Sequence, residues 1–267
     1  EIGARPGVAA SISVDGNMIV SGITTLGSDA IINSINVGKG ANSVACNTVV
    51  GETALDASVT GGNNTAIGKD TLSDLTSGAR NTAIGADAGE NITTGNDNTA
   101  IGSGTMVDLT TGSNNTSCGK GSLALITTAS NNTAVGYDAM NANTTGTQNV
   151  AVGTQALDAN TTANSNVAIG YVALGANTTG ADNTAVGTAA LDANTTASSN
   201  TAVGRSTLGA NTTGTRNTAV GANALDANTT GNYNVAIGNH ALGAANASNN
   251  TSVGDYSMEV STTGTLN

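Results

Sequence analysis

A glycine recurs every seventeen residues along most of this 267-residue chain. This period is too short for a helical pair or a propeller blade, and it fits one coil of a β-solenoid stacked on copies of itself. Glycine suits a tight corner that needs a positive φ or a close backbone approach. The sequence therefore predicts an all-β rod of 17-residue coils. The expected corner glycines are Gly51, Gly68, Gly85, Gly102, Gly119, Gly136, Gly153, Gly170, Gly187, Gly204, Gly221 and Gly238.

An asparagine stands four residues before each of these glycines, and we number it position 1 of the coil. Asparagines that stack along such an axis form ladders in which amide pairs with amide. The expected ladder comprises Asn47, Asn64, Asn81, Asn98, Asn115, Asn132, Asn149, Asn166, Asn183, Asn200, Asn217 and Asn234.

Position 4 is apolar in every coil, which favours a place in the core. Position 2 is Thr or Val, and alternate residues of a strand share one face, so positions 2 and 4 are expected to point inward together. The expected core column is Val50, Ile67, Ile84, Ile101, Cys118, Val135, Val152, Ile169, Val186, Val203, Val220 and Ile237. Position 9, as in Leu157, Leu174 and Leu191, is expected to form the inner face of a second strand with the Ala found at position 11 from Ala142 onward.

Position 10 alternates between aspartate and glycine in the second half of the chain. Carboxylates one rung apart on an outward face would repel each other, and alternation doubles their spacing to about 9.6 Å. The residues are Asp158, Gly175, Asp192, Gly209, Asp226 and Gly243.

The composition limits both the core and the partners. The chain has no Trp or Phe and only 9% charged residues, which indicates a narrow aliphatic interior. An apolar residue kept in phase over a dozen repeats argues against disorder. The net charge of −11 argues against nucleic acid and against an anionic membrane surface.

The repeat divides the chain into two parts. Residues 1–32 lie outside the repeat and are predicted to be an N-terminal β cap or connector, with a hairpin turn at Asp15-Gly16 between Ser11–Val14 and Asn17–Val20. Residues 33–267 are predicted to be the repeat roll, regular from residue 47.

Residues that often carry chemistry are few and scattered. Cys118 is expected in the core and too far from Cys46 for a disulfide, and His240, the only histidine, lacks partners for catalysis. The Asn-Thr-Thr runs match glycosylation acceptors but are expected to be repeat corners. Six carboxylates are candidates for paired acid chemistry, yet a solvated rim is the favoured interpretation: Asp70, Asp74, Asp87, Glu90, Asp97 and Asp108. We expect no enzyme activity, catalytic residue, metal or cofactor.

The segment Asn166-Val167-Ala168-Ile169-Gly170 is similar to the N-S-V-A-I-G repeat in the heads of trimeric autotransporter adhesins, without its serine, which Asn33–Gly38 keeps. That resemblance implies a left-handed parallel β-roll of three chains packed side by side. The longer unit, with A-L-x-A-N-T-T-G, resembles repeats of tail-fibre and other structural proteins of phages, as Val20–Gly27 resembles strands that precede them. The resemblance covers residues 20–27 and 33–267, and the coils here are longer than those usual in the adhesin heads.

The function predicted from these features is mechanical. We expect a structural fibre segment, a rigid trimeric shaft or adhesive rod on a phage particle, whose partners are its own copies, adjacent fibre or baseplate modules, and a host receptor or glycan. One alternative is the head of a trimeric autotransporter-type adhesin on a bacterial surface. A second is an ice-binding solenoid, although the adjacent pair Thr144 and Thr145 would leave only one outward column of threonines.

Overall fold

The structure is a computed structural model that describes residues 9–12, 18–21, 29–32, 34–244 and 246–259. The first two strands, β1 (Ala9–Ile12) and β2 (Met18–Ser21), pair antiparallel, with Ile12 opposite Met18. The hairpin predicted in this region is therefore present, although its turn at Asp15-Gly16 lies outside the described residues and its strands are displaced by one to two residues.

All the other strands belong to one sheet of 15 strands, and the described residues contain no helix beyond the 3-10 turn η1 (Ala41–Ser43). The sheet starts with β3 (Ala30–Ile32) and β4 (Ile35–Gly38), which pair antiparallel, and β4 also pairs antiparallel with β5 (Thr48–Gly51). The strands that follow are parallel: β6 (Thr65–Ile67), β7 (Thr82–Ile84), β8 (Thr99–Ile101), β9 (Thr116–Cys118), β10 (Thr133–Val135), β11 (Val150–Val152), β12 (Val167–Ile169), β13 (Thr184–Val186), β14 (Thr201–Val203), β15 (Thr218–Val220), β16 (Val235–Ile237) and β17 (Thr251–Val253).

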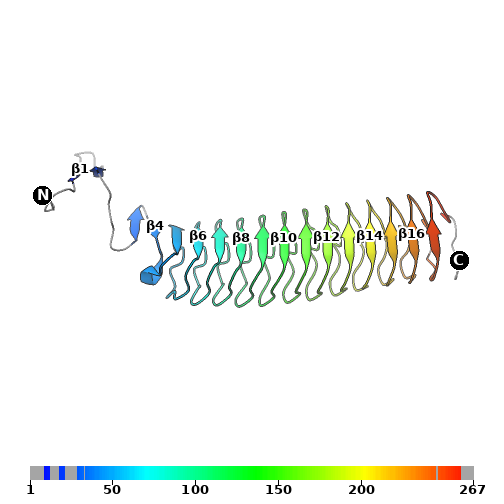
Figure 1. Ribbon diagram of the computed structural model, residues 1–267, viewed down its shortest axis with the longest axis horizontal. Coiled ribbons are helices and arrows are strands. Elements are labelled where there is room, and N and C mark those ends of the chain that lie inside the picture. Colours follow the sequence, from blue (N-terminus) through cyan, green and yellow to red (C-terminus); the bar gives the residue numbers. More distant parts are fainter. Residues whose placement is uncertain (1–8, 13–17, 22–28, 33, 245, 260–267) are drawn as a thin grey trace.

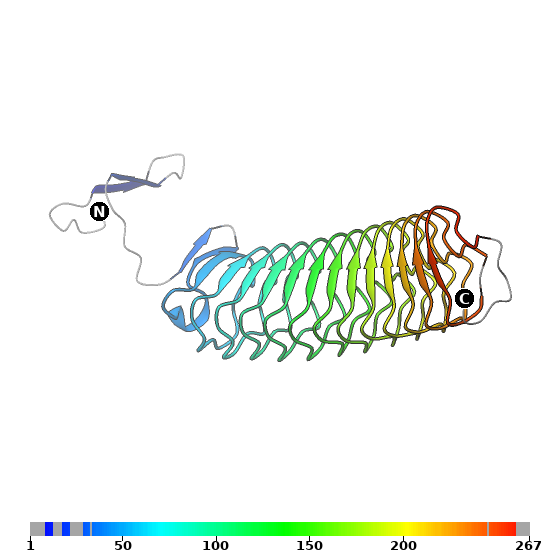
Figure 2. The same cartoon turned by 45° about the vertical axis from the view of Figure 1, so that its right-hand side comes forward.

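The coils stack in register, so that like residues form columns along the rod. Val50 pairs with Ile67, and Ile67 pairs with Ile84. Figure 1 shows the resulting row of arrows, one from each coil, and Figure 2 shows how each coil returns behind the sheet. The predicted β-solenoid of 17-residue coils is therefore confirmed.

Backbone hydrogen bonds join the coils outside the strands as well. Leu55 N–H donates to the Thr71 carbonyl (3.0 Å) and Thr76 N–H to the Thr93 carbonyl (2.9 Å). The return path of each coil consists of turns, yet its peptide groups still find partners one coil away. This continuous satisfaction of the backbone lets a thin rod hold together without a large core.

Successive residues of each strand point to opposite sides, as expected. The residues that point inward, however, are the ones that were predicted to point outward. Position 3 points inward, and Ala66, Ala83 and their equivalents are buried, whereas position 4 is at the surface, with Ile67 37% exposed. The interior is shared by small groups from several positions and has no room for a column of Val and Ile. The core assignment was therefore wrong for the whole position 4 column, which is exposed or partly exposed: Val50, Ile67, Ile84, Ile101, Cys118, Val135, Val152, Ile169, Val186, Val203, Val220 and Ile237.

The expected second strand is also absent from the described coils, because positions 6 to 11 form turns. Leu157, Leu174 and Leu191 are fully buried, as expected, but they adopt left-handed backbone conformations with φ of 52–55°. Ala142 at position 11 is only partly buried. The inward residue is the one that follows it, at position 12.

Position 12 changes character halfway along the rod. From the second to the fifth coil it is aliphatic, as Leu75, Ile92, Leu109 and Ile126. Further on it is the buried asparagine of the Asn-Thr-Thr runs, and from Asn160 onward each amide donates to the asparagine of the preceding coil, as in Asn160 Nδ2 to Asn143 Oδ1 (2.7 Å). These asparagines are inaccessible to glycosylation in the folded roll: Asn143, Asn160, Asn177, Asn194, Asn211 and Asn228.

The asparagines at position 1 form a buried ladder that joins side chains to backbone as well as amide to amide. Asn183 Nδ2 donates to the Ala197 carbonyl (2.9 Å) and to Asn166 Oδ1 (3.2 Å). Its own Oδ1 accepts the backbone N–H of Asn200 (3.0 Å). Each asparagine therefore closes its own coil and fixes the next one.

The corner glycines from Gly68 onward have φ between 126° and 145°, a region that side chains rarely adopt. A Cβ at Gly153 would also overlap the carbonyl group of Gly170, the equivalent residue one coil along. Both the backbone angle and the close stacking therefore require glycine at position 5.

Replacing a ladder asparagine should destabilise the roll strongly. In Asn183→Ala the buried N–H of Asn200 and the carbonyl of Ala197 lose side-chain partners, at a cost on the order of 2–4 kcal/mol in the free energy of unfolding. Urea denaturation followed by circular dichroism measures the change. Thr196→Ala, at an exposed corner, is the control and should change stability by less than about 0.5 kcal/mol.

Relieving one strained backbone position should have the opposite effect. Val172 is β-branched and lies at φ 49°, whereas Gly104 occupies the equivalent place at φ 64°. Asparagine tolerates this conformation, so Val172→Asn should raise the free energy of unfolding by about 0.5–1 kcal/mol. The reciprocal change Gln155→Val, at φ 54° one coil earlier, should lower it. Equal effects of both variants would contradict this explanation.

Candidate functional surface

The outward side of the parallel sheet carries two regular columns of side chains. Position 2 contributes Thr or Val and is partly exposed in most coils, and position 4 contributes Val or Ile. The exposed fractions at position 4 include 37% for Val152, 40% for Ile169 and 66% for Val253. We call the side chains at positions 2 and 4 of all the coils, from residue 48 to residue 253, the outer face. Cys118 is part of it, and both Cys118 and Cys46 are exposed free thiols.

Polar and aromatic residues flank the outer face in sequence, at positions 6 and 17. Position 6 carries the exposed side chains of Lys120, Tyr137, Tyr171 and Arg205. Position 17 holds contacts between successive coils. There Arg80 pairs with Asp97 (2.6 Å), and the Arg216 guanidinium lies 5.4 Å from the centre of the Tyr233 ring.

The Asp/Gly alternation at position 10 places each of these aspartates beside the glycine of the next coil, at a distance that a Cβ could occupy in ordinary contact. A Cβ on Gly175 would lie 3.5 Å from Asp158 Oδ1, and one on Gly209 would lie 3.4 Å from Asp192 Oδ1. Each aspartate thus leans over the glycine of the next coil. Partial burial there raises the pKa of the Asp158 and Asp192 carboxyls above their ordinary value.

His240 lies in a column of position 7 side chains. Its Nε2 is 3.1 Å from Asn223 Nδ2, and its ring stacks on Tyr256 with centroids 5.1 Å apart. These contacts bind one coil to the next, and they place no nucleophile or carboxylate beside the ring.

The six candidate carboxylates are divided among different roles. Asp70 accepts a hydrogen bond from Thr53 and lies 3.1 Å from Lys69 Nζ, and both contacts lower its pKa. Asp97 is held by Arg80. Glu90 differs, because burial first and neighbouring negative charges second raise its pKa. Those charges come from Asp70, Asp74, Asp87 and Asp108.

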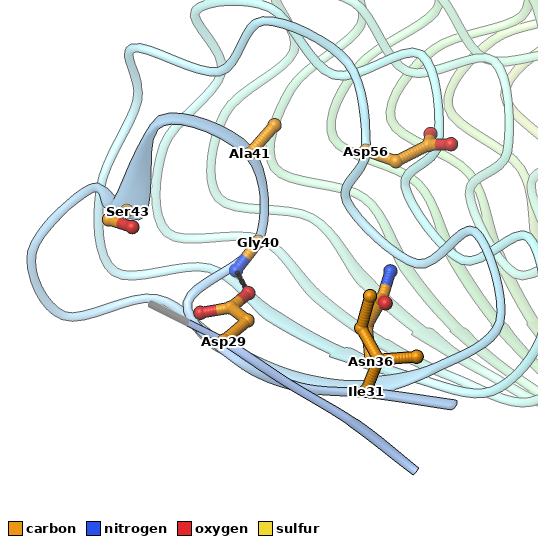
Figure 3. A pocket seen from close by; sticks show the side chains of 7 residues that line it. All are labelled: Asp29, Ile31, Asn36, Gly40, Ala41, Ser43 and Asp56. Atoms are coloured by element: carbon orange, nitrogen blue, oxygen red, sulfur yellow. Dashed lines mark hydrogen bonds between the residues drawn. The ribbon is translucent and has the colours of Figure 1, made fainter. Parts of the chain in front are cut away.

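An open pocket of about 370 Å³ lies at the N-terminal end of the roll (Figure 3). Asp29 is already engaged there, since its carboxylate accepts hydrogen bonds from the backbone N–H groups of Lys39 (2.7 Å) and Gly40 (2.5 Å). Asn36, Ser43 and Asp56 are the other polar side chains drawn around the pocket, with Ile31 beside Asn36. The two hydrogen bonds of Asp29 fasten the backbone at residues 39–40, directly before η1.

The described residues contain no group of three or more His, Cys, Asp or Glu placed to hold a metal ion. None of the helical structure in the described part of the chain is long and apolar enough to cross a membrane.

No family model, curated protein or solved structure matches the chain. The surface described above is therefore the main guide to function.

Sequence reasoning missed the outer face because it assigned the larger apolar residue of each strand to the core. A signal for the correct phase was present. Position 3 is Ala in most coils, with Val49, Ser117 and Ser252 as the departures. A column restricted to small residues is what a narrow interior requires, and the bulky column is then left outside.

The acidic cluster gives a prediction about pH. The raised pKa of Glu90 means that its ionisation costs more in the folded chain, so stability is lost as the pH rises through that pKa. Glu90→Gln should therefore stabilise the roll at pH 7 and have little effect below the ordinary Glu pKa of about 4.3. Thermal unfolding at both pH values measures this. High salt should reduce the gain only in part, because burial is the first cause.

Proposed function

We propose that this protein is a structural fibre segment, a stiff shaft on a phage particle such as a tail fibre or related appendage. The observation that supports this most is the uninterrupted, in-register stack from β5 to β17. At about 4.8 Å per coil the stack spans roughly 60 Å. Every coil is tied to the next by backbone and asparagine ladders, which suits a rod that holds two points apart.

Assembly as a homotrimer is part of the proposal. The partners would be two further copies, adjacent fibre or baseplate modules, and a host receptor or glycan at the cell surface. The proposed location is the virion.

Two alternative functions would use the roll in different ways. A trimeric autotransporter-type adhesin would place the same roll on a bacterial surface. An ice-binding solenoid would use the outer face, where Thr at position 2 and Val or Ile at position 4 form a regular array. The Thr144 column is unsuited to ice, because its hydroxyl donates to the Thr161 carbonyl (3.0 Å) of the next coil.

Antibodies raised against the roll distinguish these locations. Labelling of thin appendages on phage particles in electron micrographs is the expected result. Labelling of the bacterial outer surface in the absence of phage would favour the adhesin. Thermal hysteresis of the purified chain would favour ice binding.

Removal of whole coils tests the spacer role. Deleting residues 166–199, two coils with one Asp/Gly pair at position 10, joins Ser165 to Asn200 and keeps the ladder in phase. The product should remain folded and be shorter by about 9.6 Å. Deleting residues 166–174 breaks the period and should unfold the adjacent coils. Small-angle scattering and circular dichroism measure the two outcomes, and equal tolerance of both deletions would contradict the stacked-rod function.

A further inference from the structure

The side chains at position 6 form a column along one corner of the roll. Each follows the corner glycine, and its carbonyl accepts the N–H of position 7 in the next coil, as at Tyr137 from Gln155 (2.9 Å) and at Tyr171 from Ala189 (2.9 Å). These bonds fix the backbone beneath the column, so that its side chains project from equivalent places one coil apart. Six successive members are all exposed, and we call them the corner column: Lys120, Tyr137, Thr154, Tyr171, Thr188 and Arg205.

Two tyrosines of the corner column stand two coils apart with open ring faces. Tyr137 is 48% exposed and Tyr171 is 55% exposed, and neither ring stacks on another aromatic ring of the described chain. The other two tyrosines differ, because each ring lies against a side chain of the neighbouring coil. Two coils separate the open rings by about 9.6 Å along the axis, with Thr154 between them. Exposed tyrosines of this kind are typical of a binding surface.

Basic side chains stand at both ends of the corner column. Lys120 lies one coil before Tyr137, and Arg205 lies two coils after Tyr171. The described residues provide neither cation with a salt bridge, whereas two other basic residues of the roll are paired with aspartates. The column contains no carboxylate, and Asp138, which hydrogen-bonds with the Tyr137 hydroxyl and raises its pKa, is the only acidic residue next to it in sequence. The column therefore combines open rings with positive charge at each end.

The spacing of the rings fits a linear polysaccharide. The C–H face of a sugar ring packs against an exposed tyrosine, while the sugar hydroxyls remain available to polar neighbours. In an extended chain with a two-sugar repeat, alternate sugars present the same face. Such a chain running along the roll rests one sugar on Tyr137 and the next but one on Tyr171. The Thr154 side chain then lies beside the sugar between them, where its hydroxyl can exchange hydrogen bonds.

The charges indicate that this polysaccharide is acidic. The Arg205 guanidinium can bind a carboxylate through paired hydrogen bonds, and the Lys120 ammonium supplies a point charge. A uronic acid on alternate sugars brings only a few carboxylates to this stretch of about 24 Å. A nucleic acid carries a phosphate on every nucleotide, for which two cations are too few on a chain of net charge −11. Carboxylates elsewhere on the roll are screened beyond a Debye length of about 8 Å in physiological salt.

We propose that the corner column binds an extended acidic polysaccharide, with sugar rings packed on Tyr137 and Tyr171 and carboxylates held by Lys120 and Arg205. The inference rests on the proposed function, because it names the class of cell-surface glycan that the fibre segment contacts and the residues that contact it. The backbone bonds between coils hold the two rings at a fixed separation before the ligand arrives. Binding therefore costs little ordering of the protein.

Titration calorimetry with oligosaccharides of hyaluronan, alginate and polygalacturonate tests the site. At least one of these acidic probes should bind the wild-type chain with a dissociation constant below about 1 mM. Tyr137→Ala and Tyr171→Ala should each raise that constant at least about fivefold, because each removes a surface on which a sugar packs. Tyr233→Ala, which removes an exposed tyrosine at position 17, is the control and should bind as the wild type does. Failure of all three probes to bind, or equal effects of the three variants, would overturn the site.

The role of charge has its own variants. Lys120→Gln and Arg205→Gln should each weaken binding of the acidic probe and reduce its dependence on salt, because each removes a partner of a carboxylate. Lys39→Gln makes the same change of net charge away from the corner column and should have no effect. Cellohexaose, an uncharged linear probe, should bind more weakly than the acidic one. Equal affinity for both probes would overturn the assignment of an acidic ligand.

The spacing of the rings is tested without a change of composition. The double variant Thr154→Tyr/Tyr171→Thr places the two rings in adjacent coils, where they meet opposite faces of successive sugars. Its affinity should fall to that of Tyr171→Ala, with the circular dichroism spectrum unchanged. Wild-type affinity in this variant would overturn the match between alternate coils and alternate sugars.

Deletion of residues 166–199 separates this inference from the fibre function. The deletion removes Tyr171 and Thr188 but keeps the asparagine ladder in phase, so the rod should shorten as expected and lose the polysaccharide. A shortened rod that binds as the wild type does would overturn the site alone. A chain that binds through both tyrosines yet is absent from phage appendages would overturn the fibre function and leave the site in place.

Discussion

The buried asparagine at position 1 is the contact on which the rest of the structure depends. Its Nδ2 closes the coil by reaching a carbonyl near the end of the same coil, and its Oδ1 receives the backbone of the next coil, as at Asn183. The coil from Asn234 is one residue shorter, yet Asn234 keeps both bonds, to Ala247 and from Asn250. In the position 12 column, by contrast, Asn228 Oδ1 is buried without a hydrogen-bond partner. The position 1 ladder therefore keeps its contacts through the shorter coil.

The narrow interior determines what the surface can be. Backbone ladders and buried amides at position 1 leave space mainly for small residues at positions 3 and 8, Leu or Met at position 9 and one further side chain at position 12. The bulky residues favoured in strands must then point outward. The outer face thus follows from the same constraint that makes the rod thin.

Periodicity alone predicted the solenoid, the coil boundaries and the need for glycine at position 5, because each depends on spacing. It did not predict which side of a three-residue strand is inside. Both sides of the strand carry apolar residues here, as Ala66 and Ile67 show, so alternation gives no sign of direction. The left-handed leucines, such as Leu157 at φ 55°, were also missed, since glycine or asparagine is the usual marker of that conformation.

The range of residue types found in a column depends on where the column lies in the roll. Packing restricts positions 3, 8 and 9 inside the roll to a few residue types. Positions 6 and 17 vary widely from coil to coil among charged, polar and aromatic residues. Position 4 is exposed too, and strand propensity alone would accept Thr or Tyr there, yet it is Val, Ile or Cys in every coil. Since the interior does not impose this restriction, its cause lies on the outer surface of the roll.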